Sequence, residues 1–141
     1  MQLITAIFDG VAVGTMALAW AKGSAAERVG TSLNLLMVVL VSAVHEYAPA
    51  TIVADLVMTT DGIFALALLG LAVVYAYPWV GVALLLQGVQ FGLHATYYVQ
   101  HRQADLLHAW VNNLDSWGVL ICLFVGTVLA WRRRMAEPAR A

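Results

Sequence analysis

Ionisable and amide side chains interrupt the apolar segments of this sequence at positions where they could share one pocket. His94 follows Gln90 by one helical turn on a long apolar segment, so both would lie on one helix face. An ionisable group at the centre of a membrane helix costs about 2.5–3.5 kcal/mol and usually faces the bundle interior. The candidate polar pocket consists of Asp9, His45, Glu46, Asp61, Gln90, His94 and Asp115.

Two interpretations of these residues compete. In the functional one they line a shared pocket that binds or transfers something. In the other, which we favour from the sequence, they hydrogen-bond one another between helices or reach the lipid headgroups. Asp9 and His94 lie deepest in their segments and are the hardest to explain in the second way.

Several chemistries are open to such a pocket. His45 and His94 could ligate a haem, or a divalent metal together with Glu46 and Asp61, because imidazole and carboxylate are suitable ligands. A histidine beside a carboxylate could also handle protons. However, the sequence has no HExxH, no Gly-x-Ser-x-Gly, no phosphate-binding glycine loop and no second cysteine besides Cys122. We therefore expect no catalytic residue and no cofactor, with a haem-, metal- or proton-handling subunit as the alternative.

The composition indicates an all-α membrane protein. Of 141 residues, 62% are hydrophobic and only 11% are charged, against about 25% charged in soluble domains, and the mean hydropathy is +0.84. The net charge of −1 gives no sign of a nucleic-acid partner. The lipid bilayer is the partner that the composition predicts.

The apolar segments predict a compact bundle of about five transmembrane helices within residues 1–131, followed by a basic cytoplasmic tail, residues 132–141. Polar or mixed stretches at 22–31, 50–60 and 101–108 are expected to separate them. The predicted spans are residues 3–21, 32–47, 62–77, 79–100 and 110–131.

Pro78 decides between five spans and four. If the chain only kinks there, residues 62–100 form one helix of about 58 Å, roughly twice the hydrocarbon thickness of a bilayer. A turn at Pro78 is therefore expected, because proline removes a backbone donor and disfavours helix at the residue before it.

Charge sets the expected orientation. With five spans, the first loop and the C-terminus share one side and hold six of the seven basic residues: Lys22, Arg28, Arg132, Arg133, Arg134 and Arg140. By the positive-inside rule, this side faces the cytoplasm and the N-terminus is periplasmic, in a bacterial inner membrane. The candidate polar residues then gather in the outer half, and the inner half is nearly apolar apart from Asn34.

Small residues spaced by four predict helix-packing faces. Gly10 and Gly14 form one such pair, and Gly88 and Gly92 form the other. Close backbone approach at these pairs could pack helices within the chain or join copies in a homo-oligomer.

The C-terminal third carries a resemblance. Leu93-His94-Ala95-Thr96-Tyr97-Tyr98, with Asn112-Asn113-Leu114 following before an apolar span, resembles small uncharacterised multi-spanning membrane proteins of tailed phages and prophages of proteobacteria. The resemblance implies an origin and no activity. Together with the basic C-terminus, it leads us to expect a small accessory or lysis-related protein, similar to a holin and without catalysis.

Overall fold

Residues 2–136 fold into five α-helices joined by short turns. The structure is a computed structural model, and it describes residues 2–136, without the side chains of residues 2–6 and 9. The described residues contain no strand, which confirms the all-α prediction. The helices are α1 (Gln2–Lys22), α2 (Ala25–Tyr47), α3 (Val53–Tyr75), α4 (Pro78–Val99) and α5 (Leu106–Ala136).

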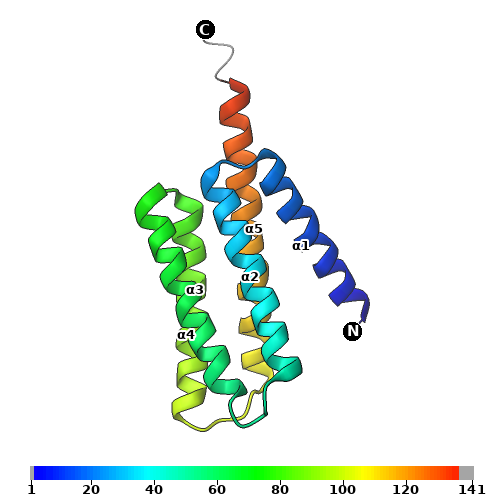
Figure 1. Cartoon of the computed structure of the whole chain (residues 1–141), viewed down its shortest axis with the longest axis vertical. Coiled ribbons are helices and arrows are strands. Elements are labelled where there is room, and N and C mark those ends of the chain that lie inside the picture. Colours follow the sequence, from blue (N-terminus) through cyan, green and yellow to red (C-terminus); the bar gives the residue numbers. More distant parts are fainter. Residues whose placement is uncertain (1, 137–141) are drawn as a thin grey trace.

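The helices run alternately up and down, and four of them enclose the interior. Helices α2, α3, α4 and α5 contact one another in a ring, and α1 packs against α2 and α5 (Figure 1). The N-terminal part of α1 diverges from the bundle, while its end at Lys22 lies beside the start of α2. Side chains from all five helices line one cavity in this arrangement.

Two segments expected to lie outside helices are helical. Helix α2 begins at Ala25 instead of residue 32, because Ser24 and Glu27 form a capping box that satisfies its first amide groups. Helix α3 begins at Val53 and includes most of the mixed stretch 50–60. There the hydroxyl of Thr59 donates to the carbonyl of Asp55 at 2.7 Å, so this polar side chain is satisfied within its own helix.

The predicted turn at Pro78 is confirmed. Helix α3 ends at Tyr75, and the next residue, Ala76, adopts the left-handed conformation with φ 50° and donates its amide to the carbonyl of Ala72. Tyr77 is extended, as the residue before a proline prefers, and Pro78 is the first residue of α4. Residues 62–100 are thus two antiparallel helices.

Three helices are long and apolar enough to cross a membrane. By length and composition these are α2, α3 and α5, among the residues that the structure describes. Helix α4 carries Gln87, Gln90 and His94, which lower its hydropathy. The structure therefore supports the membrane prediction through three of the five helices.

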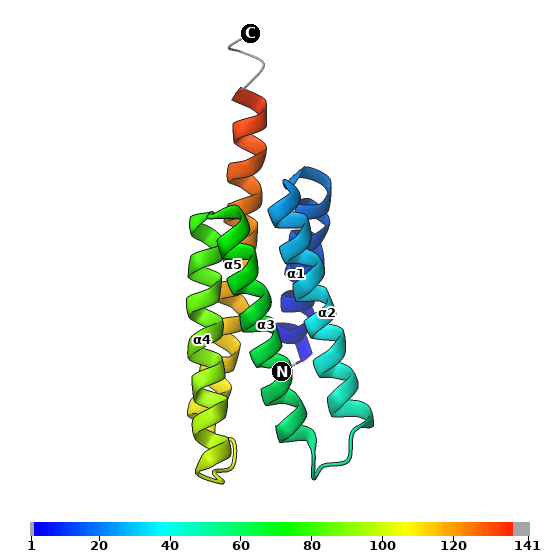
Figure 2. The same ribbon diagram turned by 60° about the vertical axis from the view of Figure 1, so that its left-hand side comes forward.

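The two ends of the bundle differ in charge. Lys22, Arg28 and the arginines 132–134 lie at one end, the arginine end, where α5 extends beyond the other helices (Figure 2). The turns 48–52 and 100–105 lie at the opposite end, the histidine end, with His45 and His101. Helix α5 continues through the first residues of the predicted tail to Ala136. Residues 137–141 of that tail lie outside the described residues.

The predicted glycine faces are not used for packing inside the chain. A Cβ added at Gly10, Gly14, Gly88 or Gly92 would meet no atom within 4 Å, because these glycines face outward from α1 and α4. The glycines at helix contacts are others: Gly30, Gly62, Gly118 and Gly126. The outward faces are left for lipid or another copy of the chain.

Candidate functional site

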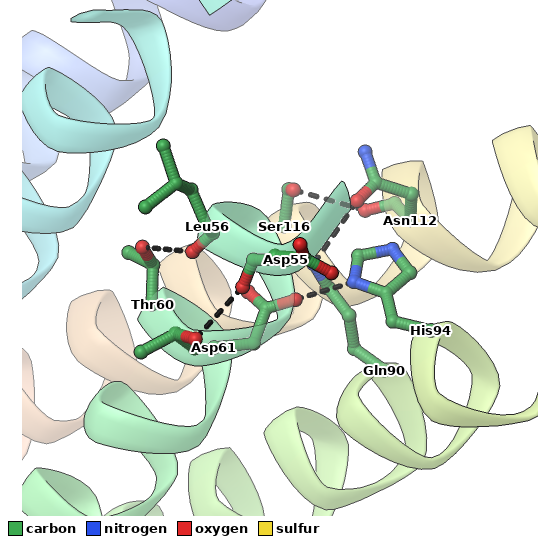
Figure 3. Close-up of polar contacts among 9 residues, drawn as sticks. Asp55, Leu56, Thr60, Asp61, Gln90, His94, Asn112 and Ser116 are labelled. Carbon is green, nitrogen blue, oxygen red and sulfur yellow. Dashed lines mark hydrogen bonds and ion pairs between the residues drawn. The ribbon is translucent and has the colours of Figure 1, made fainter. Parts of the chain in front are cut away.

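A buried carboxylate–histidine pair joins α3 and α4. Asp61 and the Nδ1 atom of His94 form a hydrogen bond, with both side chains more than nine-tenths buried. The sequence placed Asp61 at the mouth of a helix starting at residue 62. Since α3 starts at Val53, Asp61 instead lies about two turns inside it and points toward His94 (Figure 3).

A second histidine extends this pair to α5. The ring of His108 stacks on that of His94, with centroids 4.7 Å apart and planes 22° from parallel. His94 therefore contacts both a carboxylate and a second imidazole. His108 was not among the predicted site residues, although the turn expected between residues 101 and 108 brings the start of α5 back beside the end of α4.

The turn between α4 and α5 is fixed by a carboxylate. The hydroxyl of Tyr97 donates to Asp105 at 2.6 Å, and Asp105 also accepts the amide of His108 at 3.1 Å and pairs with Arg102. The Tyr97 bond, then the His108 amide and Arg102, lower the pKa of Asp105 from 3.8 to about 2. This carboxylate stays ionised at neutral pH and holds His108 in place.

Deeper in the bundle, several amide and carboxylate groups lack partners. Gln90 donates to Asn112 at 3.0 Å across α4 and α5 (Figure 3). Its Oε1 atom has no hydrogen-bond partner, and neither does Nε2 of Gln87 or Oδ1 of Asp115. Buried polar groups are nearly always paired, with protein atoms or with water, and all three of these side chains line one cavity.

Two adjoining cavities connect these groups. The vestibule, at the histidine end, has a volume of about 600 Å³ and is lined by His45, His94, Tyr97, Tyr98, His101 and His108 among others. The chamber, deeper in the bundle, has about 240 Å³ and is lined by Phe8, Asn34, Phe64, Gln87, Asp115 and Ser116 among others. Val41, Asp61, Gln90 and Asn112 line both. The Asp61–His94 pair thus stands where the vestibule meets the chamber.

The predicted pocket residues divide into groups. Asp61, Gln90, His94 and Asp115 lie in the walls of these cavities. His45 lines the vestibule but is exposed, and its Nδ1 atom bonds to the carbonyl of Val41 at 2.9 Å.

Glu46 and Asp9 are the remaining two predicted residues. Glu46 is exposed and lines neither cavity. The side chain of Asp9 lies outside the described part of the structure. Among the described residues, no three His, Cys, Asp or Glu side chains are arranged to hold a metal ion.

A second buried carboxylate lies near the arginine end, where the sequence predicted an almost apolar interior. Glu27 is completely buried; it accepts the amide of Ser24 at 2.7 Å and the indole Nε1–H of Trp79 at 2.9 Å. The prediction was wrong because Glu27 was assigned to a loop. As part of α2 it faces the interior, ties the start of α2 to the start of α4, and is a structural contact.

Comparison with protein family models, curated proteins and solved structures gives no match. The resemblance to phage membrane proteins therefore stays a prediction.

Proposed function

We propose that this chain is a five-span bacterial inner-membrane protein that moves protons across the membrane, along a path that runs from its histidine end into the bundle interior. The observation that carries this proposal is the contact of His94 with Asp61 on one side and His108 on the other, where the two cavities meet.

The outward surface supports five spans. Helix α4 is not one of the three candidate membrane spans by length and composition, but Leu85 and Val89 on it are 72% and 64% exposed, so it still presents an apolar outer face. Its polar side chains Gln87 and Gln90 face inward. A helix of 22 residues is about 33 Å long, which matches the hydrocarbon core.

The arginine end is proposed to face the cytoplasm. Arg133 lies over the ring of Tyr77 at 4.9 Å, and Lys22 lies over Trp131 at 5.5 Å. The histidine end also has such a contact, Arg102 over Tyr97 at 4.9 Å, so the orientation rests on the excess of Lys and Arg at the arginine end.

Reporter fusions test this topology. A periplasm-dependent reporter fused after Gln103 is expected to be active, because turn 100–105 lies at the histidine end, and one fused after Met135 is expected to be silent. The reverse pattern would contradict the orientation, and activity of both fusions would contradict the number of spans.

The chemistry of the site supports proton transfer. Pairing of Nδ1 with Asp61 orients the imidazole of His94, and the remaining ring nitrogen can exchange a proton with water in the cavities or with a neighbouring group. Asp115, Gln87 and Gln90 offer polar atoms along the chamber to bind such water. The two adjoining cavities thus give a continuous row of polar groups from the histidine end to the middle of the bundle.

Proton uptake by proteoliposomes tests the function. With a pH-sensitive dye inside and a potassium diffusion potential as driving force, the wild-type chain is expected to change the internal pH. His94→Asn should lower the rate by about 100-fold, the scale of a positioned acid–base group.

The matched control is His45→Asn, because His45 also lines the vestibule but bonds only to its own helix. This variant should transport at close to the wild-type rate. No uptake by the wild-type chain, or equal rates for wild type and His94→Asn, would overturn the proposal.

A lysis-related role is the second candidate, and the outward faces of Gly10, Gly14, Gly88 and Gly92 favour it, because they leave room for copies to associate. In that case, expression should collapse the membrane potential equally in wild type and His94→Asn. A proton-specific activity that needs His94 would favour the first candidate.

A further inference from the structure

We propose that the chamber binds a small organic ammonium ion, held by Asp115, Gln90 and Gln87. This inference names a ligand class for the site of the proposed function. It rests on the proposed function in one respect, that the ligand enters through the vestibule.

The unpaired atoms define the recognition chemistry. Asp115, Gln87 and Gln90 are 6%, 3% and 9% exposed, and each has one polar atom without a partner. Two of these atoms, Oδ1 of Asp115 and Oε1 of Gln90, are acceptors, and Nε2 of Gln87 is a donor. A ligand with N–H donors and a hydroxyl would complement all three.

The charge of the chamber selects a cation. Its ionisable lining residues are Asp61 and Asp115, and no lysine, arginine or histidine lines it among the described side chains. Asp61 is already paired with His94, whereas Oδ1 of Asp115 is unpaired. A carboxylate in surroundings of low polarity attracts an ammonium group more strongly than it would in water.

The size and walls of the chamber favour an organic ion over a metal ion. About 240 Å³ exceeds the roughly 150 Å³ of an engineered cavity that accommodates benzene. Phe8 and Phe64 contribute aromatic walls, and Trp117 supports Phe8 edge-on at 4.8 Å. Aromatic faces attract organic cations and cover their methylene groups, whereas a hydrated metal ion has no methylene groups to cover.

Equilibrium dialysis of the purified full-length chain in detergent tests the proposal, with radiolabelled ethanolamine as the probe. Ethanolamine carries an ammonium group and a hydroxyl, and ethylene glycol is its uncharged counterpart. Ethanolamine is expected to bind saturably and to resist competition by ethylene glycol. Asp115→Asn should weaken binding about tenfold or more, as a charge-assisted bond becomes a neutral one.

Two variants serve as controls. Asp55→Asn removes an exposed carboxylate that lines neither cavity, and it should bind ethanolamine as the wild type does. Ala12→Leu narrows the chamber from the α1 side without altering charge, and it should weaken binding by steric exclusion. This second variant tests the site if Asp115→Asn does not fold.

The outcomes separate this inference from the proposed function. His94→Asn should retain ethanolamine binding while losing proton uptake, because dialysis requires no proton movement. The ammonium site would be overturned if the wild type bound no ethanolamine, or if folded Asp115→Asn bound ethanolamine as tightly as the wild type. It would also be overturned if potassium chloride displaced radiolabelled ethanolamine as well as unlabelled ethanolamine does. A chain that transports protons but binds no ethanolamine would leave the proposed function standing alone.

Discussion

Gly126→Val is expected to destabilise the bundle by about 3 kcal/mol. A Cβ at this position would lie 2.5–2.7 Å from atoms of the Trp79 indole. Trp79 cannot move away freely, because Gly30 of α2 lies against its other side and its Nε1–H donates to Glu27. The larger side chain would therefore displace the indole and leave the fully buried Glu27 without one of its donors.

Titration with sodium dodecyl sulfate from a mild detergent, followed by circular dichroism, measures this loss. Gly88→Val is the matched control, since it makes the same change in a helix where nothing lies within 4 Å, and its stability should stay close to wild type. If both variants lose the same stability, the contact of Trp79 with Gly126 is not what holds α4 against α5.

The second large effect concerns the Asp61–His94 pair. His94→Leu is expected to cost about 3 kcal/mol, because it leaves a carboxylate buried without its partner. The double variant Asp61→Leu/His94→Leu is expected to be more stable than His94→Leu alone, since replacing both partners by apolar side chains removes the unpaired charge.

The same detergent titration compares wild type, both single variants and the double variant. His45→Leu is the control for losing an exposed histidine, and it should change stability by less than about 0.5 kcal/mol. Strictly additive losses for Asp61→Leu and His94→Leu would contradict a direct pairing of the two residues.

Some polar groups in the bundle fit the structural interpretation that the sequence left open, and others fit the functional one. The Asp61–His94 pair and the Gln90–Asn112 bond do join helices, as the structural interpretation requires. Asp115 and Gln87 keep unpaired atoms beside a cavity, which pairing between helices does not explain. The search for function should therefore concentrate on the chamber.

The helical class, the turn at Pro78 and the candidates Asp61, Gln90, His94 and Asp115 could be predicted from the sequence alone. These depend on local properties: long apolar segments, the backbone restrictions of proline, and the cost of a polar group in an apolar helix. Helix starts were predicted less well, because a capping box at Ser24 and threonines bonded to their own helix extend α2 and α3 into polar sequence.

Which polar residues contact one another depends on helix packing and could not be predicted from the sequence. His108 stacks on His94 because the α4–α5 turn reverses the chain. This contact depends on the register of the two antiparallel helices. Glu27 became a buried contact because the indole of Trp79 reaches it from a helix 52 residues away. In the sequence, Asp61 and His94 are two separate polar interruptions of apolar segments, and the packing of α3 on α4 makes them one pair at the junction of two cavities.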